Sequence, residues 1–271
     1  MHHISFQNVS FGYNATRVLE NINLEAEPGD FICLLGPSGC GKSTLLRLAA
    51  GLANPVTGKI FIDSTEIRKP GLDRGVVFQD YSLFPWMTIR ENVVLAIKQA
   101  YLSKTEIEAD EIAENYLELV GLNGSFDKLP RELSGGMKQR AAIALVFAIN
   151  SPVLLMDEPF GALDAITRAH LQDLLLQLWN YNGRERKTVL FVTHDVDEAI
   201  LLSGKIVIFS LNPGKIREVI RVDLPRPRKR QDLYTDPAYQ SLREQVMHTL
   251  NESIVRQLDV GSVSDKYGDR I

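Results

Sequence analysis

The sequence predicts an α/β protein whose core is a parallel sheet, and two observations carry this prediction. Residues 31–35 form a continuous apolar run, which is typical of a parallel strand covered on both faces. A glycine-rich loop follows, and then residues 44–50 place leucines at helical spacing. Alternating strand-like and helical runs resume later in the chain, at residues 153–156, 165–181, 188–193 and 205–209. This alternation favours parallel pairing of the strands.

Other segments flank this core. Residues 4–35, which include the apolar run 31–35, predict short strands that are broken at Gly12 and at Pro28–Gly29. Residues 88–150 turn helical, with Thr105 as a candidate N-cap and a helix over residues 135–149. They therefore predict a helical insertion.

The C-terminal part begins with a basic segment around two prolines, which contains Arg217, Arg221, Arg226, Arg228, Lys229 and Arg230. Charge runs of this kind are usually solvated, so a solvated linker is the main interpretation and attraction to anionic lipid the alternative. A final helix over about residues 236–258 carries one apolar stripe, formed by Leu242, Val246, Leu250, Ile254 and Leu258.

Composition excludes several classes of protein. The chain has 271 residues, 45% hydrophobic and 24% charged, with a net charge of −4, which is ordinary for a soluble globular protein and lacks the overall basic charge of a nucleic-acid binder. Two cysteines, Cys33 and Cys40, are too few for a disulfide framework and favour a reducing compartment. The N-terminus lacks the apolar region of a secretory signal, and no apolar run approaches 18 residues, so we expect the chain not to span a membrane alone.

The glycine-rich loop is a strong signal because it matches G-x-x-x-x-G-K-[ST] between a buried strand and a helix. Its residues are Gly36, Pro37, Ser38, Gly39, Cys40, Gly41, Lys42, Ser43 and Thr44. In such a P-loop the backbone N–H groups surround phosphate oxygens, the lysine neutralises the β- and γ-phosphates, and the first hydroxyl ligates Mg²⁺. The sequence therefore predicts a nucleotide site that binds ATP and Mg²⁺, with Lys42 and Ser43 in these roles.

A second site signal lies about 110 residues later, where the apolar strand over residues 153–156 ends in Asp157 and Glu158. Alternation along a strand sends the two side chains to different sides. We therefore expect Asp157 to belong to the Mg²⁺ shell and Glu158 to face the attacking water.

The P-loop defines nucleotide binding but not a family, and the segment Leu133-Ser134-Gly135-Gly136-Met137-Lys138-Gln139-Arg140 narrows the choice. It resembles the signature motif of the ATP-binding-cassette (ABC) family, in which a serine and two glycines open a helix. The free N–H groups of a helix N-terminus bind anionic phosphate, so Ser134, Gly135 and Gly136 are candidate ATP-binding residues. On its own the motif is equally well a helix-capping turn.

Four further elements of that family appear in order. Tyr13 matches the aromatic residue that stacks on adenine, Gln79 the glutamine that contacts Mg²⁺, residues 161–164 the D-loop, and His194 the switch histidine. Each has an ordinary structural alternative, since Tyr13 can be core, Gln79 a surface amide and His194 a strand-end residue. Met137 and Gly161 depart from the usual residues of the family without removing a phosphate or metal ligand.

The resemblance implies a fold and an assembly. The fold is a P-loop NTPase with a RecA-like parallel sheet core, an N-terminal antiparallel β subdomain and a helical insertion subdomain. The ATPase domain spans residues 1–220, with the helical subdomain at about 88–150, and residues 221–271 form an extension. In the implied homodimer, ATP lies between Lys42, Asp157 and Glu158 of one chain and Ser134–Gly136 of the other, with Glu158, His194 and Lys42 catalytic.

Four segments, residues 70–79, 83–86, 158–164 and 222–228, also look like the nitrate/sulfonate/taurine import subfamily of bacterial ABC transporters. This likeness implies a peripheral subunit at the cytoplasmic face of the inner membrane that hydrolyses ATP for a separate integral-membrane permease and, indirectly, a periplasmic solute-binding protein. The aromatic-rich segment 81–87 lies at the family's permease-docking surface, with local core packing as the alternative. Nothing in the chain identifies the solute, and no nucleic acid is expected.

Two other functions remain as alternatives. A soluble ABC ATPase acting on DNA or ribosomes usually carries two cassettes or a very long insertion between the P-loop and the signature, and this chain has neither. A nucleotide-gated binding module without turnover is disfavoured because both catalytic positions, Glu158 and His194, are filled.

Overall fold

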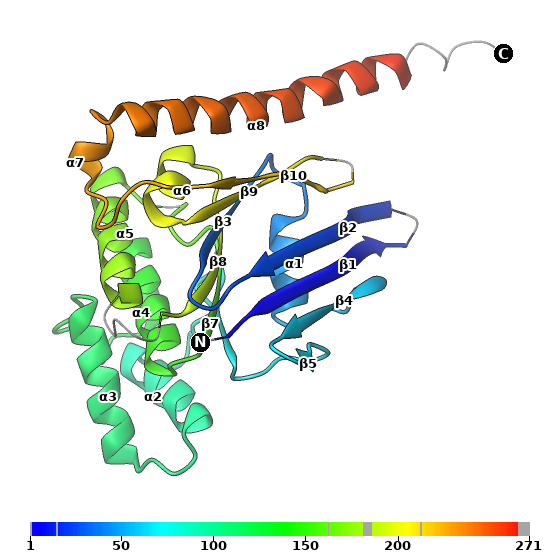
Figure 1. Cartoon of the computed structure of the whole chain (residues 1–271). Helices are drawn as coiled ribbons and strands as arrows, with labels where there is room; N and C mark the ends of the chain where they lie inside the picture. Colours follow the sequence, from blue (N-terminus) through cyan, green and yellow to red (C-terminus); the bar gives the residue numbers. More distant parts are fainter. Residues whose placement is uncertain (1, 15, 162, 181–185, 212, 265–271) are drawn as a thin grey trace.

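Two sheets organise the protein. The computed structural model describes residues 2–14, 16–161, 163–180, 186–211 and 213–264, with side chains as far as residue 253 apart from that of residue 232. One sheet has six strands in the order β10-β9-β3-β8-β7-β6 (Figure 1), and the other has four in the order β2-β1-β4-β5. The strands of the six-stranded sheet, in chain order, are β3 (Phe31–Leu35), β6 (Arg74–Val77), β7 (Val153–Asp157), β8 (Thr188–Val192), β9 (Lys205–Phe209) and β10 (Ile216–Arg221).

The predicted parallel core is confirmed. β3 pairs in parallel with β8 and β9, and β7 pairs in parallel with β8 and β6. All five residues of β3 are buried, as expected for a strand with both faces covered. Only β10 runs antiparallel, against β9.

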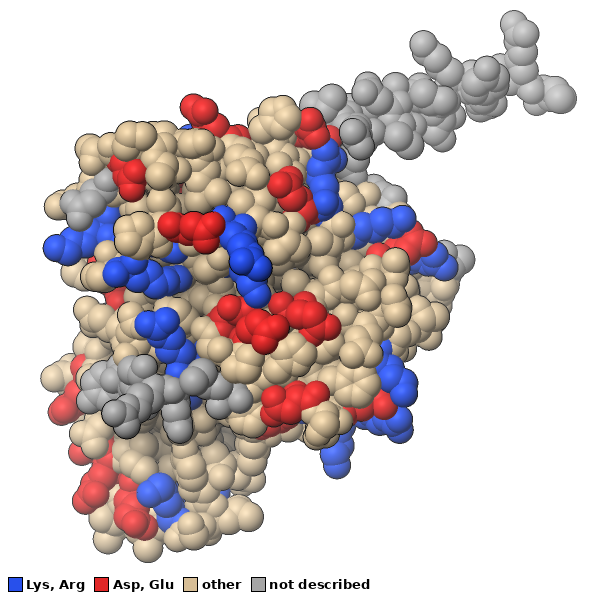
Figure 2. All heavy atoms as spheres, viewed as in Figure 1, with Lys and Arg blue, Asp and Glu red and all other residues tan. Residues whose placement is uncertain are grey.

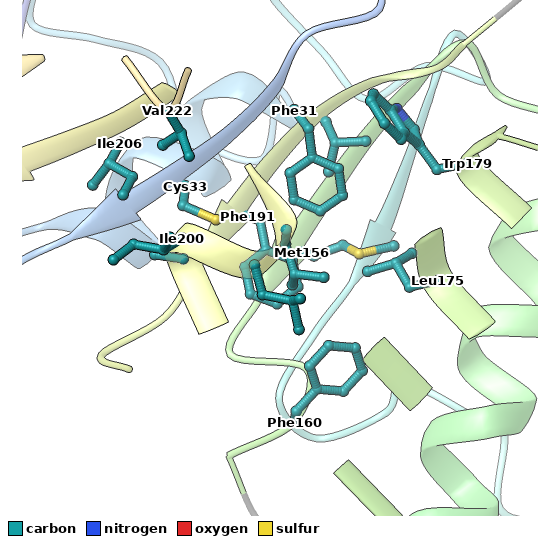
Figure 3. Packing of buried hydrophobic residues seen from close by; sticks show 14 of the residues in the cluster. Phe31, Cys33, Met156, Phe160, Leu175, Trp179, Phe191, Ile200, Ile206 and Val222 are labelled. Atoms are coloured by element: carbon teal, nitrogen blue, oxygen red, sulfur yellow. The ribbon is translucent and has the colours of Figure 1, made fainter. Parts of the chain in front are cut away.

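The two faces of β3 belong to two different hydrophobic cores. Ile32 and Leu34 pack in a cluster with helix α1 (Lys42–Ala49) and the four-stranded sheet. Cys33 and Leu35 lie in the other cluster, with helices α4 (Gly135–Ala148), α5 (Ala165–Asn180) and α6 (Val196–Leu202). Figure 3 shows this second cluster, where the side chains of neighbouring strands converge. Alternation along one strand therefore separates α1 from α4 by the thickness of the sheet.

The strands of the N-terminal sheet are β1 (Ile4–Tyr13), β2 (Thr16–Ala26), β4 (Thr57–Ile62) and β5 (Thr65–Glu66). Each neighbouring pair of these strands is antiparallel. The prediction that Gly12 breaks the first strand is wrong. Gly12 lies within β1 opposite Arg17, where a Cβ atom would come within 2.4 Å of the carbonyl oxygen of Thr16. Glycine is required there by close backbone approach instead of by a turn.

The predicted helical region contains α2 (Ile89–Ala100), α3 (Glu106–Leu119), a 3₁₀ turn (Pro130–Glu132) and α4. Thr105 caps α3 as predicted, and its side chain forms a capping box with Glu108. Thr88 and Glu91 cap α2 in the same way. These helices share a third apolar cluster of their own, distinct from the two cores that contact the parallel sheet.

The C-terminal part packs against the body of the protein, so the solvated-linker interpretation is wrong for much of the basic segment. Arg217 and Arg221 lie in β10, and Val222 and Leu224 after it are buried. A short helix α7 (Arg230–Leu233) leads to α8 (Pro237–Ser264), which Figure 1 shows running across the body with its far end projecting away. Within the described side chains, Leu242, Val246 and Leu250 of the expected stripe pack on the core. Ile254 and Leu258 lie in α8, but their side chains are outside what the structure describes, as is the whole of the expected helix residue Tyr181.

Arg228 explains why the basic segment folds back. Its guanidinium is buried and donates to the carbonyl oxygens of Ile200 at 2.7 Å and Ser203 at 2.5 Å, at the end of α6. It also donates to those of Val222 at 3.0 Å and Leu224 at 3.1 Å. One side chain thus satisfies carbonyl groups of a helix C-terminus and ties the chain after β10 to it.

Within the described ranges, no helix is both long and apolar enough to cross a bilayer. Cys33 and Cys40 are both buried and unpaired.

Arg228→Met is expected to lower the free energy of unfolding by about 3 kcal/mol, because buried carbonyl groups lose charge-assisted hydrogen bonds. Arg221→Met is the control, since Arg221 is an exposed arginine of the same segment. Urea unfolding followed by circular dichroism measures both. Equal stabilities for the two variants would contradict the bridging role of Arg228.

Candidate active site

Three loops meet at the carboxyl edge of the parallel sheet. In the register of the sheet, Leu34 of β3 and Asp157 of β7 both lie opposite Val192 of β8. The P-loop after β3, Glu158 after β7 and His194 after β8 therefore leave the sheet side by side. Ligands of open parallel sheets bind at this edge.

The P-loop leads into α1 through a glycine whose backbone angles lie in the left-handed region. Gly41 has φ = 92° and occupies the N-cap position of α1, without a side-chain cap for the first N–H groups. A Cβ atom at Gly41 would also lie 2.5 Å from Cδ2 of Leu19 in β2. Glycine is thus needed both for the backbone angle and for packing against the N-terminal sheet.

Lys42 is held inside this loop. Only 6% of the residue is exposed, and its Nζ donates to the carbonyl oxygens of Gly36 at 2.7 Å and Pro37 at 3.0 Å. The ammonium group is thereby kept at the centre of the loop. Burial raises the pKa of Cys40, so its thiol is an unreactive part of the loop wall.

Ser43 and Asp157 come together from segments 114 residues apart. The Ser43 hydroxyl donates to Oδ1 of Asp157 at 2.8 Å. Burial raises the pKa of Asp157, the bond from Ser43 opposes this, and the nearby charge of Glu158 raises it further. A hydroxyl and a partly buried carboxylate fit Mg²⁺, which prefers a few oxygen ligands completed by phosphate and water.

Glu158 points to a different neighbour, as strand alternation predicted. Its Oε2 lies 3.4 Å from Nδ1 of His194, and its backbone N–H donates to the carbonyl oxygen of Val192. Glu158 has φ = 44°, an unusual backbone angle for a residue with a side chain. Such strained positions cluster at active sites, where the surrounding structure holds a side chain in a required direction.

Tyr13 and Gln79 are both exposed. Tyr13, at the end of β1, stacks edge-on against Phe11 with ring centroids 5.0 Å apart, so the alternative that it is a core residue is wrong. Gln79 follows β6, which pairs with β7 so that Val77 lies opposite Met156. Gln79 is therefore near the edge that carries Asp157, but no hydrogen bond among the described residues joins the two.

The signature residues lie at the start of α4. The hydroxyl of Ser134 accepts from the N–H of Met137, and a Cβ atom at Gly136 would lie 2.8 Å from Cγ2 of Thr167. α4 and α1 cover opposite faces of the sheet. Within one chain, the sheet therefore lies between the signature residues and the P-loop. No hydrogen bond between the two groups occurs in the described part of the chain.

The D-loop leads from Glu158 into α5. Asp164 accepts from the N–H groups of Ile166 and Thr167, which lowers the pKa of its carboxyl group. Gly161 donates its N–H to the carbonyl oxygen of Glu158. Ala162 of the predicted D-loop lies outside the described residues.

Sequence reasoning missed a polar network behind His194. Buried Glu198 in α6 accepts from Gln172 of α5 at 2.5 Å and is hydrogen-bonded to Thr193, and burial raises the pKa of its carboxyl group. Asp195 caps α6 by accepting from the N–H of Glu198. The available signal was Glu198 directly before the apolar run 199–202. Because Asp197 comes next to it in the first turn of the same helix, the sequence does not show which of the two carboxylates is buried.

Comparisons with known proteins agree with this geometry. The family model described as "ABC transporter" matches residues 19–161. A putative ATP-binding protein of Brucella abortus (strain 2308) is 47% identical over 247 residues, which is 91% of this chain and 93% of that protein. The bicarbonate transport ATP-binding protein CmpD of Synechocystis sp. is 46% identical over 252 residues, covering 91% and 88% of the two chains. A dimeric post-hydrolysis structure of the ATP-binding cassette MJ0796, bound to ADP and Pi, superposes with a TM-score of 0.72, with 31% identity over 82% of this chain and all of that one.

An α/β core with a P-loop, covered by an antiparallel sheet and a helical region, defines an ABC ATPase cassette. The chain belongs to the ABC transporter family and is an ATP-binding subunit of that family. The predicted fold class is confirmed.

Gly41→Ala and Gly39→Ala separate packing from backbone strain, since both glycines have positive φ but a Cβ atom at Gly39 meets no atom nearer than 3.9 Å. Gly39→Ala is expected to cost about 1 kcal/mol of stability from strain alone. Gly41→Ala is expected to cost about 1–3 kcal/mol more, because its methyl group overlaps Leu19. Thermal unfolding without nucleotide measures the difference, and equal costs would show that contact with Leu19 does not constrain the loop.

Proposed function

We propose that this subunit hydrolyses ATP to energise import of a small solute through a separate permease. The observation that carries the proposal is the meeting of Ser43, Asp157, Glu158 and His194 at the sheet edge beside the P-loop. Hydrolysis of ATP needs charge stabilisation on the phosphates and an oriented water, and these side chains supply both.

Each residue has a distinct role in this proposal. Lys42 exchanges its bonds to the loop carbonyls for bonds to the β- and γ-phosphates. Glu158 orients the attacking water and accepts its proton, held in place by its backbone bond to Val192. His194, within 3.4 Å of Glu158, contacts the γ-phosphate. Tyr13, exposed at the end of β1, stacks on adenine.

Ser43, Gln79 and Asp157 are the residues that would hold Mg²⁺, which when bound neutralises charge on the phosphate oxygens. Asp157 already lies beside the Ser43 hydroxyl. Gln79 follows the neighbouring strand β6 and is exposed.

We propose a homodimer in which each ATP is completed by Ser134, Gly135 and Gly136 of a second copy. One chain keeps α4 and α1 on opposite faces of its sheet, so its own signature does not complete its own site. The N–H groups at the start of α4 suit anionic phosphate. The dimeric structures of the MJ0796 cassette support this assembly.

The filled positions Glu158 and His194 favour turnover over gated binding without hydrolysis. None of the relatives reported above is named for action on DNA or ribosomes, so the alternative of a soluble ATPase acting on nucleic acid has no support here.

The proposed docking surface for the permease is the loop between β6 and α2. Trp86 is 73% exposed and Phe84 45%, and their rings lie 5.4 Å apart. Buried Asn92 holds this loop by accepting from the N–H of Phe84 and donating to the carbonyl oxygens of Phe84, Met87 and Thr88. The local-core alternative is therefore wrong for Trp86, and a rigid aromatic pair suits insertion between permease side chains.

The transported solute in this proposal is a small anion or similar compound, delivered by a periplasmic solute-binding protein. The nitrate/sulfonate/taurine likeness of the sequence and the similarity to a bicarbonate transport subunit both favour this class. The subunit then acts at the cytoplasmic face of the inner membrane. We assign the ATPase to residues 1–220, including the helical subdomain at 88–150, and treat residues 221–271 as an extension.

Glu158→Gln is expected to bind ATP but to lose about 10²- to 10⁴-fold in turnover, because the amide keeps the shape of the side chain without accepting a proton. The variant should accumulate as an ATP-bound dimer. Phosphate release and gel filtration with ATP and Mg²⁺ measure the two effects. Turnover close to wild type would overturn the assignment of Glu158.

Trp86→Ala is expected to weaken copurification with the permease, because the docking loop loses its most exposed aromatic anchor. ATP binding by the isolated variant should remain as in wild type. Leu102→Ala is the matched control, since Leu102 is also exposed but lies in the loop between α2 and α3. Equal copurification of the two variants would contradict docking at this loop.

A further inference from the structure

A cavity of about 560 Å³ lies away from the proposed ATP site, between α5 and the basic segment of residues 226–231. Asp173, Leu176 and Gln177 of α5 form one wall. Arg226, Lys229 and Arg230 form the other. Figure 2 shows basic side chains grouped on the side of the molecule where Figure 1 places α5 and α7. The volume is within the usual range for small-ligand pockets.

The charge of this cavity is predominantly positive. Arg228 also contributes to the lining, but its guanidinium is consumed by the carbonyl oxygens that it bridges. The lining also contains the cationic groups of Arg226, Lys229 and Arg230, against the single carboxylate of Asp173. One guanidinium nitrogen of Arg226 donates to the carbonyl oxygen of Leu202 at 2.6 Å. Arg230 lies 3.8 Å from that carboxylate, and no hydrogen bond or ion pair to a described side chain engages the Lys229 ammonium.

Arg226 is confined next to a like charge. Its guanidinium and that of Arg186 each lie 4.8 Å from the ring centroid of Trp179. Burial, and to a smaller extent the charge of Arg186, lower the pKa of Arg226 to about 10. A negative group in the cavity would relieve both the desolvation and the repulsion.

A chain of hydrogen bonds leads from the cavity to the candidate active site. Arg230 donates to Oε1 of Gln172 at 2.6 Å. The amide nitrogen of Gln172 donates to Glu198 at 2.5 Å. The backbone N–H of Glu198 donates to Asp195 at 3.0 Å, and the N–H of Asp195 donates to the hydroxyl of Thr193 at 3.0 Å, so these bonds flank His194. Gln172 and Glu198 are both buried, so this path excludes water and has defined partners at each step.

We propose that the cavity between α5 and residues 226–231 is a regulatory site for a small dianion, and that its occupation slows ATP hydrolysis through Arg230, Gln172 and Glu198. The binding part stands on the cavity alone, whereas the regulatory part rests on the proposed ATPase function.

The expected effect of the dianion on ATP hydrolysis follows from the hydrogen bonds of Arg230 and Gln172. A dianion held by Lys229 and Arg226 draws Arg230 toward itself and away from Gln172. The Gln172 amide then loses the partner that keeps its nitrogen on Glu198. Thr193 is held less firmly as a result, and so is the adjacent His194. The dianion must therefore favour the state with slower hydrolysis, since it binds best when Arg230 has turned.

The test uses sulfate as the probe and Trp179 as the reporter. The chain has two tryptophans, so in the complete subunit carrying Trp86→Phe the remaining one is Trp179, stacked beneath Arg226. Sulfate titrated against chloride at constant ionic strength is expected to change its fluorescence saturably. Lys229→Gln should weaken this binding about threefold to fivefold, as for a partly exposed ion pair. Arg221→Gln, an exposed arginine of the same segment, should leave it unchanged.

The regulatory part is tested by turnover at saturating ATP, where competition by sulfate at the P-loop does not contribute. Saturating sulfate is expected to lower kcat about fivefold, the low end of ordinary coupling. Lys229→Gln should keep the basal kcat and require more sulfate for the same effect. Gln172→Met should still bind sulfate, as the Trp179 signal reports, but its kcat should no longer respond.

The results of these experiments test the anion site, its coupling to hydrolysis and the proposed function separately. No saturable Trp179 signal, or a signal equally strong in Lys229→Gln, overturns the site. Binding without a change in kcat, or an unchanged sulfate response in Gln172→Met, overturns the coupling. Absence of basal ATP hydrolysis would overturn the proposed function, while saturable binding of sulfate would still support the site.

Discussion

The parallel pairing of β3, β8 and β7 is the constraint on which the site depends. In this register Leu34 and Asp157 share Val192 as their partner. Because parallel strands all end at the same edge, segments far apart in sequence leave the sheet next to one another. The bond from Ser43 to Asp157 and the approach of Glu158 to His194 are direct consequences.

The burial of β3 on both faces has a second consequence. Its alternating side chains join two cores, one containing α1 and the other containing α4. The P-loop and the signature segment are thereby fixed on opposite faces of the sheet. This separation is the physical basis of the proposed homodimer.

Hydrogen bonds connect the C-terminal segment to the helices next to the carboxyl edge of the parallel sheet. Arg228 joins the end of α6 to the chain after β10, and α6 begins at the cap formed by Asp195, next to His194. Gln172 and Glu198 join α5 to α6 on the same side. Packed, hydrogen-bonded contacts thus connect the basic segment to the residues beside His194.

Local features were predictable because they depend on neighbours in the chain. The apolar run 31–35, the glycine loop and the cap at Thr105 each encode their own structure, and α4 begins at Gly135 as expected. Features that depend on backbone segments far away in the sequence could not be predicted. Gly12 serves a close approach to Thr16 within a strand instead of a break, and β10 is a strand because β9 offers it an edge.

The sequence by itself determined the parallel core, the P-loop, the candidate residues and the family resemblance, because spacing along the chain specifies them. Only the tertiary structure decided that the basic segment packs back on the core. Charge in sequence cannot distinguish a solvated arginine from Arg228, whose burial is stabilised by carbonyl oxygens from two separate segments. The network of Gln172 and Glu198 behind His194 has the same origin, since its members are polar residues that become partners only when α5 and α6 pack side by side.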